Sequence, residues 1–254
     1  MLDKLLNKKY ITYTTRGNES IKLVLKFCRH IGIKNILIQD QGGWITYEQF
    51  ARKLKLNVVK LKTDYGVIKQ IPRIEDAALI VNSLTGYFAE QPMKKIADYC
   101  KRNHLLLIND VSGSIGTDIA KYGDIIIGSF GRHKPLSIEK GGFIAADNKL
   151  KHHFFQIHRQ SFEINQKQLN NKIKKLNQRI EDLHKINKKI KKDLNNCNIL
   201  HKKLRGINVI AAFKTKKQKQ EIIDYCKKNK YPYKECPMNI KVNVPAISIE
   251  VQQL

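Results

Sequence analysis

Short apolar runs alternate with longer amphipathic stretches over residues 18–146. Runs of four or five residues rich in Ile, Leu and Val are typical of strands buried on both faces of a parallel sheet. Apolar residues at helical spacing lie between them, most clearly over residues 19–31 and 91–103, and Asn18 is the expected N-cap of the first helix. The pattern predicts βα units on a mostly parallel sheet, and therefore an α/β fold. The predicted strands are residues 35–38, 57–61, 78–82, 105–109, 125–128 and 142–145.

Residues 161–196 have a different character, because a polar sequence there carries a single apolar stripe at three- or four-residue spacing. The spacing predicts one long helix with one apolar face. Such a helix fits a coiled-coil seam, a dimer contact or a crossover helix laid along the large domain, and we favour the crossover. The stripe consists of Leu169, Ile173, Leu176, Ile180, Leu183, Ile186, Ile190 and Leu194.

The C-terminal part predicts a small α+β unit, with strands at residues 208–213 and 246–251 and a helix over residues 217–230. With a boundary near Asp147, the chain divides into three segments. We expect a large α/β domain over residues 1–146, a helical crossover segment over residues 147–205 and a small domain over residues 206–254.

Composition favours a soluble globular protein, with 42% hydrophobic and 28% charged residues. No apolar run approaches the roughly 20 residues of a membrane-spanning helix, and the N-terminus lacks the apolar stretch of a secretory signal. We therefore expect a cytoplasmic protein. The five cysteines are scattered without a C-x-x-C pair, so neither a metal site nor a disulfide framework is predicted.

The formal net charge of +26 raises the question of an anionic partner. Lys and Arg bind nucleic acid by releasing counterions from the phosphate backbone, but here the excess is mostly lysine without interleaved aromatics. A solvated, lysine-rich surface is favoured over nucleic-acid binding, and attraction of anionic metabolites is a third use of the same charge.

Two residues that follow successive predicted strands carry the chemistry. Asp110 ends one apolar run and Lys134 follows the next, so both fall at the carboxyl edge, where open α/β sheets bind ligands. A Schiff-base enzyme needs a lysine amine at the cofactor aldehyde and a carboxylate at the pyridine nitrogen. The pair therefore predicts a pyridoxal 5'-phosphate site, with the Ser129 hydroxyl available to the phosphate. Each residue alone would be an ordinary cap or a solvated side chain.

The order Ser129-Phe130, Lys134 and Gly141-Gly142 resembles the cofactor-lysine signature of DegT/DnrJ/StrS-type aminotransferases. Similarity extends over most of residues 14–146, and the chain would be a short member. The resemblance implies an aspartate-aminotransferase-like large domain with a mixed seven-stranded sheet, a small C-terminal α+β domain, and homodimers with active sites near the subunit interface.

The resemblance also implies roles for further residues. Gly17 and Asn18 match the turn that binds the cofactor phosphate, although an ordinary N-cap is the alternative. Trp44 falls where an aromatic ring stacks on the pyridine ring, and buried packing is its alternative. Asn82 matches a loop that makes polar contacts near the ring, and Ser112 is a further candidate in the loop after Asp110. Lys241 could meet a substrate carboxylate.

The implied activity is transfer of an amino group from a donor such as glutamate to a keto-sugar nucleotide or another small ketone. Lys134 would carry the cofactor and move protons, and Asp110 would keep the ring nitrogen protonated. Two alternatives stay open: a lyase or desulfurase-like relative of the same fold, and an inactive relative that binds nucleic acid or protein through its lysine-rich half.

Overall fold

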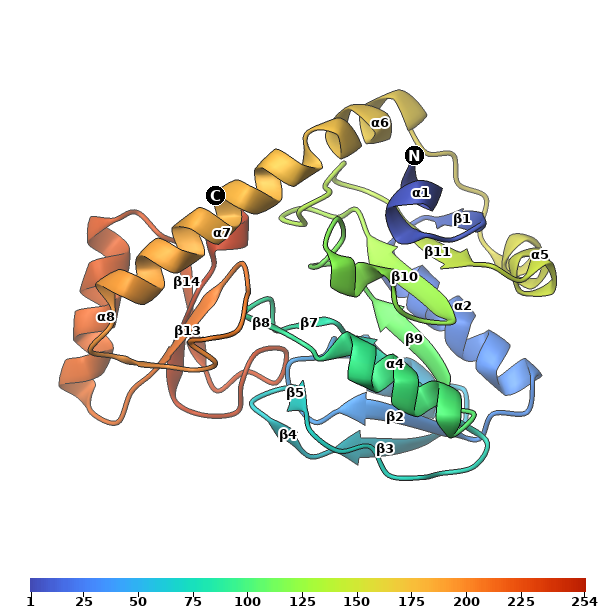
Figure 1. Cartoon of the computed structure of the whole chain (residues 1–254), viewed down its shortest axis with the longest axis horizontal. Coiled ribbons are helices and arrows are strands. Elements are labelled where there is room, and N and C mark those ends of the chain that lie inside the picture. Colours follow the sequence, from blue (N-terminus) through green and yellow to red (C-terminus); the bar gives the residue numbers. More distant parts are fainter.

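The computed structural model describes all 254 residues and contains a central seven-stranded sheet (Figure 1). Its strand order is β1-β11-β10-β9-β6-β2-β3, and β11 alone runs antiparallel to its neighbours. This confirms the predicted mostly parallel, mixed α/β fold. The strands are β1 (Tyr10–Thr14), β2 (Asn35–Gln39), β3 (Asn57–Leu61), β6 (Ala77–Asn82), β9 (Leu106–Asp110), β10 (Ile125–Ser129) and β11 (Gly142–Ala146).

All six strands expected from the sequence are present, each within one residue of its predicted ends. The seventh, β1, was not predicted, because its Tyr-Ile-Thr-Tyr-Thr sequence mixes polar and apolar residues and only two of its five side chains are buried. It lies at an edge of the sheet, where pairing with β11 on one side is enough to hold it.

Helices cover both faces of this sheet. On one face α2 (Gly17–His30), α3 (Thr46–Lys53) and α5 (Lys149–His158) pack on alternate side chains of the strands, and on the other α4 (Met93–Arg102) does the same. The helix predicted over residues 91–103 corresponds to α4. The sequence analysis missed α3 and α5, which are short and carry several charged or histidine residues. Two further short elements are α1 (Leu2–Leu6) and the 3₁₀ helix η1 (Asp118–Lys121).

The start of α2 differs from the prediction. Arg16, in an extended conformation, is the N-cap, and it makes no side-chain capping bond. Asn18 was predicted as the N-cap, and that was wrong: it lies inside the first turn, where its side chain points to a neighbouring loop. Gly17 rather than a polar residue opens the helix, so no side-chain cap occupies the N–H groups at its very start.

The long polar helix is divided into α6 (Gln166–Lys174) and α7 (Leu176–Asp193), which meet at Lys175. It begins at residue 166 rather than 161. The first part of its apolar stripe packs with side chains of the seven-stranded sheet, and the later part, including Leu183 and Ile190, packs in a second cluster. The two helices therefore contact both parts of the chain, and Figure 1 shows them running from near α1 to α8.

The second cluster belongs to a four-stranded antiparallel sheet of order β12-β13-β15-β14. Of its elements, β13 (Val209–Ala212), α8 (Lys216–Lys228) and β15 (Ala246–Ile249) match the predictions, whereas β12 (Asn198–Ile199) and the polar edge strand β14 (Tyr233–Cys236) were missed. Because β12 comes from the predicted crossover segment, the sheet begins before residue 206. The division into three segments stays a prediction.

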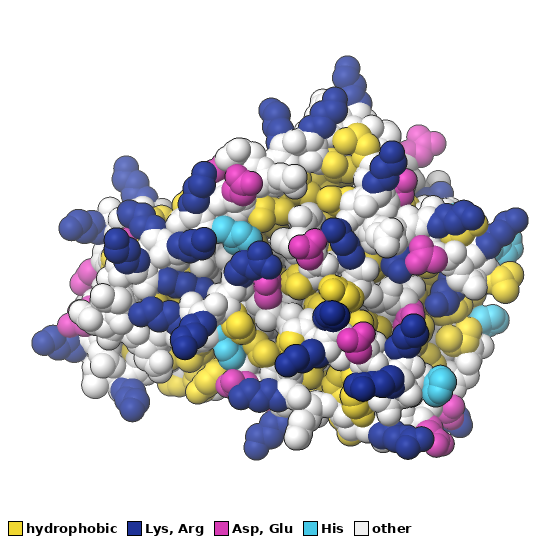
Figure 2. All heavy atoms as spheres, viewed as in Figure 1, with side chains coloured by type: hydrophobic (Ala, Val, Ile, Leu, Met, Phe, Trp, Pro, Cys, Tyr) yellow, Lys and Arg dark blue, Asp and Glu magenta, His cyan; other side chains and the backbone are white.

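The remaining elements are two small hairpins and a 3₁₀ helix: β4 (Thr63–Asp64) with β5 (Val67–Ile68), β7 (Leu84–Thr85) with β8 (Ala89–Glu90), and η2 (Val251–Gln253). None of the helices combines the length and the hydropathy that crossing a bilayer requires. Figure 2 shows Lys and Arg side chains spread over the visible face, with Asp and Glu among them, and not gathered into one stripe.

Candidate active site

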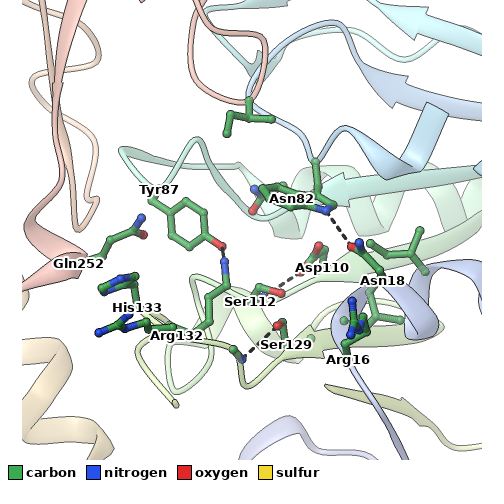
Figure 3. A pocket seen from close by; sticks show the side chains of 18 of the residues that line it. Arg16, Asn18, Asn82, Tyr87, Asp110, Ser112, Ser129, Arg132, His133 and Gln252 are labelled. Carbon is green, nitrogen blue, oxygen red and sulfur yellow. Dashed lines mark hydrogen bonds between the residues drawn. The ribbon is translucent and has the colours of Figure 1, made fainter. Parts of the chain in front are cut away.

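A cavity of about 550 Å³ lies at the carboxyl ends of the parallel strands, against the start of α2. The strands β6, β9 and β10 end there in Asn82, Asp110 and Ser129, which is the edge at which α/β sheets bind ligands. Residues that follow β14 in the chain, up to Gln253, close another side. All eight residues predicted to form the site line this cavity: Gly17, Asn18, Trp44, Asn82, Asp110, Ser112, Ser129 and Lys134 (Figure 3).

Asp110 is the last residue of β9, and its carboxylate is held by two donors. The buried Tyr47 hydroxyl donates to Oδ2 at 2.5 Å, and the Ser112 backbone N–H donates to Oδ1 at 2.9 Å. Burial, together with the adjacent Asp110 charge, raises the pKa of Tyr47 well above its usual value, so the phenol stays protonated and donates. The carboxylate is therefore fixed in one orientation at the cavity wall.

Lys134 lies in the loop after β10, and its Nζ donates to the hydroxyl of Tyr87. Burial disfavours the charged amine, but Tyr87, Asp110 and Glu250 together outweigh it and raise the pKa of Lys134. Nζ also lies 5.8 Å from the centroid of the Trp44 ring. The lysine amine is thus charged and directed among aromatic rings inside the cavity.

The start of α2 and the end of β10 pack closely together and form a site that suits an anion. The first-turn N–H groups of a helix are free, and they bind phosphate well. A Cβ on Gly17 would fall 2.7 Å from Ser129 Cβ, and one on Gly142 would fall 2.7 Å from the Gly17 nitrogen. Both glycines are needed for the backbone to approach this closely, and the Ser129 hydroxyl lines the same space. This cradle fits the phosphate of pyridoxal phosphate.

The loops beside the cradle position two more predicted residues. Trp44 Nε1 donates to Asn18 Oδ1 at 2.9 Å, which explains why Asn18 turns away from capping. The Trp44 side chain is not buried in a core, since 38% of the residue is exposed. Asn82 links two loops: its Nδ2 donates to the Gly42 carbonyl in the loop after β2 at 3.3 Å, and its Oδ1 accepts from the Leu84 N–H in its own loop at 3.2 Å.

The sequence analysis missed Tyr47 and Tyr87, which contact the predicted carboxylate and amine. Tyr47 lies in α3 and Tyr87 in the turn between β7 and β8, and each is more than 40 residues from its partner. For Tyr87, the only feature of the local sequence that indicates a turn is the preceding Gly86, which has a φ of +50°. No group of three or more His, Cys, Asp or Glu side chains is arranged to hold a metal ion.

A mixed α/β sheet with a lysine and a carboxylate at its carboxyl edge, beside a helix start that can bind phosphate, defines the class of pyridoxal-phosphate-dependent enzymes with the aspartate-aminotransferase fold. Residues 2–229 match the DegT/DnrJ/EryC1/StrS aminotransferase family, and the chain belongs to this family. It is accordingly an aminotransferase whose cofactor is pyridoxal phosphate. A comparison with curated protein sequences finds no match.

Solved structures support the fold over nearly the whole chain. A DegT/DnrJ/EryC1/StrS aminotransferase from Brucella abortus superimposes with a TM-score of 0.75 at 13% identity, covering 98% of this chain and 82% of that one. Helicobacter pylori PseC, an aminotransferase involved in the biosynthesis of pseudoaminic acid, gives 0.74 at 15% identity, with 98% and 83% covered. The E. coli GDP-4-keto-6-deoxy-D-mannose-3-dehydratase gives 0.78 at 11% identity, with 99% and 86% covered.

Proposed function

We propose that this aminotransferase moves an amino group from an amino acid such as glutamate to a keto-sugar nucleotide or another small ketone, with Lys134 and Asp110 as its catalytic residues. One observation carries the proposal: a lysine and a carboxylate from successive strands line one cavity with six further residues expected to bind the cofactor. We also propose a cytoplasmic homodimer, as the family resemblance implies.

Each residue has a role that its surroundings favour. When bound, the cofactor supplies an aldehyde for the lysine and a ring that takes up electrons. Gly17, Asn18 and Ser129 would hold its phosphate at the start of α2. Trp44 would stack on the ring, and Asp110, fixed by Tyr47 and Ser112, would keep a proton on the ring nitrogen. Lys134 Nζ would take a proton from the donor carbon and return it.

The remaining predicted residues, Asn82 and Ser112, would complete the polar contacts near the ring. Further out, the cavity lining is cationic, with Arg16, Arg132 and Lys140 opposed by Glu139. This excess of positive charge favours an anionic acceptor, as expected of a nucleotide-linked sugar. The substrates that the names of PseC and the dehydratase indicate are also sugars, which supports the same class.

The proposal is tested by the colour of the protein. Purified protein supplied with pyridoxal phosphate should absorb near the violet end of the visible spectrum, and borohydride should attach the cofactor irreversibly to Lys134, as read by peptide mass. Added L-glutamate should bleach the visible band and release the corresponding oxo acid. Lys134→Ala should show neither the band nor the attachment, because no amine is left at that position.

Lys140→Ala is the matched control, since Lys140 also lines the cavity but is exposed; it should keep the band and the attachment at Lys134. A protein that stays colourless with added cofactor contradicts the proposal, and so does attachment at a different lysine. A coloured protein that releases ammonia or sulfide instead of transferring an amino group would point to the lyase or desulfurase-like alternative. Tight, salt-sensitive nucleic-acid binding by a colourless protein would favour the binding alternative.

A further inference from the structure

The backbone at Tyr87 is held in an unusual conformation by the rest of the fold. Tyr87 lies in the turn between β7 and β8 with a φ of +69°, in the left-handed region that an aromatic residue rarely adopts. Its carbonyl oxygen accepts two backbone hydrogen bonds, from Ile207 at 2.9 Å and from Asn208 at 2.8 Å. These bonds from the segment before β13 fix the turn and thereby aim the side chain at the cavity.

A glycine makes room for the Tyr87 ring. A Cβ on Gly113 would fall 2.5 Å from both Cδ1 and Cε1 of Tyr87, so any side chain at that position would displace the ring. Gly113 has no positive φ, so space rather than backbone conformation is what requires a glycine here. Tyr87 therefore occupies the volume that a side chain in the loop after Asp110 would otherwise fill.

Two lysines flank the ring. Lys134 Nζ lies 4.7 Å from the ring centroid and Lys241 Nζ lies 5.3 Å from it, both within the range of cation–π attraction. Lys241 is buried and is fully engaged, because its ammonium meets Glu250 at 3.0 Å and the Gly86 carbonyl at 3.1 Å. The expected role for Lys241, binding a substrate carboxylate, finds no support, and the residue instead braces the Tyr87 turn.

The Tyr87 hydroxyl contacts the amine that carries the chemistry. Burial raises the pKa of Tyr87, so the group is a phenol at neutral pH. A hydroxyl can accept from the charged Lys134 ammonium and can donate to the neutral amine after a proton has left. One group can thus hold Lys134 Nζ in both protonation states that an aminotransferase needs. Figure 3 shows the Tyr87 side chain directed into the cavity that Asp110 and Ser112 also line.

We propose that Tyr87 is a positioning residue for Lys134: its hydroxyl fixes Nζ inside the cavity, and Gly113 leaves the space that the Tyr87 ring occupies. This inference rests on the proposed function of Lys134. It assigns a role to a residue of the β7–β8 turn that lies outside the lysine and carboxylate pair.

The test is Tyr87→Phe, which keeps the ring and removes the hydroxyl. We expect a folded, coloured protein in which L-glutamate bleaches the visible band with a limiting rate constant about tenfold lower, as for loss of one hydrogen bond to a charged group, while the L-glutamate concentration that gives half of this rate changes little. A second readout does not depend on turnover: cofactor uptake needs the neutral amine, so its pH midpoint should move to lower pH when the hydroxyl no longer favours the ammonium. Tyr99→Phe, on α4 away from this cavity, should leave both readouts unchanged.

Gly113→Ala provides an independent variant, because its methyl group should push the Tyr87 ring aside and reproduce both the slower bleaching by L-glutamate and the shifted midpoint. In a Gly113→Ala/Tyr87→Phe double variant the two effects should not add, since both remove the same contact. A coloured Tyr87→Phe protein with an unchanged bleaching rate constant and an unchanged midpoint overturns this inference alone. A wild-type protein that takes up no cofactor overturns the proposed function, and this inference with it.

Discussion

Gly17 shows how the absence of one side chain shapes the cofactor end of the cavity. The first turn of α2 comes so close to Ser129 that a methyl group on Gly17 would overlap its Cβ at 2.7 Å. Such close approach lets backbone N–H groups and a side-chain hydroxyl face the same anion. At the opposite wall Tyr47 and Tyr87 act similarly on Asp110 and Lys134, each fixing one polar group through one hydroxyl.

Gly17→Ala should therefore weaken binding of pyridoxal phosphate about tenfold or more, the equivalent of losing one charge-assisted hydrogen bond. Trp44, the only tryptophan of the chain, lies at the cavity and can report binding through quenching of its fluorescence. Gly131→Ala is the matched control, because a Cβ there meets only the Ser129 hydroxyl, at 3.3 Å. Equal affinities for the two variants would show that the cofactor phosphate does not sit at the start of α2.

Helix α7 contributes side chains to two separate hydrophobic clusters. Leu176 and Ile180, near its start, pack with the seven-stranded sheet, and Leu183 and Ile190 pack with the four-stranded sheet. A helix is stiff over this length, so its apolar stripe fixes how the two sheets are arranged around the cavity. The segment before β13, whose backbone N–H groups fix the Tyr87 turn, depends on that arrangement.

Ile190→Ala should lower the free energy of unfolding by about 3 kcal/mol, since the residue is fully buried and its removal leaves a cavity. Urea denaturation followed by circular dichroism measures the change. The same substitution at Ile157, which is 62% exposed on α5, should alter stability by no more than about 0.5 kcal/mol. If the two variants were equally stable, α7 would not be packed as the structure has it.

The molecule carries a net charge of +26. Most of its Lys and Arg side chains are at least partly exposed to solvent, but Lys191 is buried. Its side chain is buried on α7 and its Nζ donates to the Leu204 carbonyl at 2.7 Å. Burial lowers the pKa of Lys191 from 10.5 to about 8. The folded protein therefore loses this proton before the unfolded chain does, and the cost of burying the charge is present in full below pH 8.

The contribution of Lys191 to stability should rise as the pH increases from about 8 to 10.5, because the unfolded chain binds more protons over that range. Comparing wild type with Lys191→Met by chemical denaturation isolates this effect: the wild type should gain stability relative to the variant between pH 7 and pH 10. Lys188→Met, an exchange at an exposed position of the same helix, should show no such trend. A pH-independent difference at Lys191 would mean that the amine is solvated.

The sequence by itself determined the elements and the chemistry at their ends. Apolar periodicity is a local property, so six strands of the large sheet, its two main helices and the crossover stripe could be predicted from it. Asp110 and Lys134 could be predicted as partners because the carboxyl ends of successive parallel strands meet at one edge. Gly17, Asn18, Trp44 and Asn82, which the family resemblance implied, line the same cavity.

Only the tertiary structure decided which distant residues hold those groups. The pairing of β1 with β11, the bond from Tyr47 to Asp110 and the contact of Tyr87 with Lys134 each join residues at least 47 positions apart. No local pattern encodes such contacts, because they arise when separate elements pack together and leave space, as Gly113 does for Tyr87. The reactive pair could therefore be predicted from the sequence, whereas the tyrosines that fix it could be identified only in the folded structure.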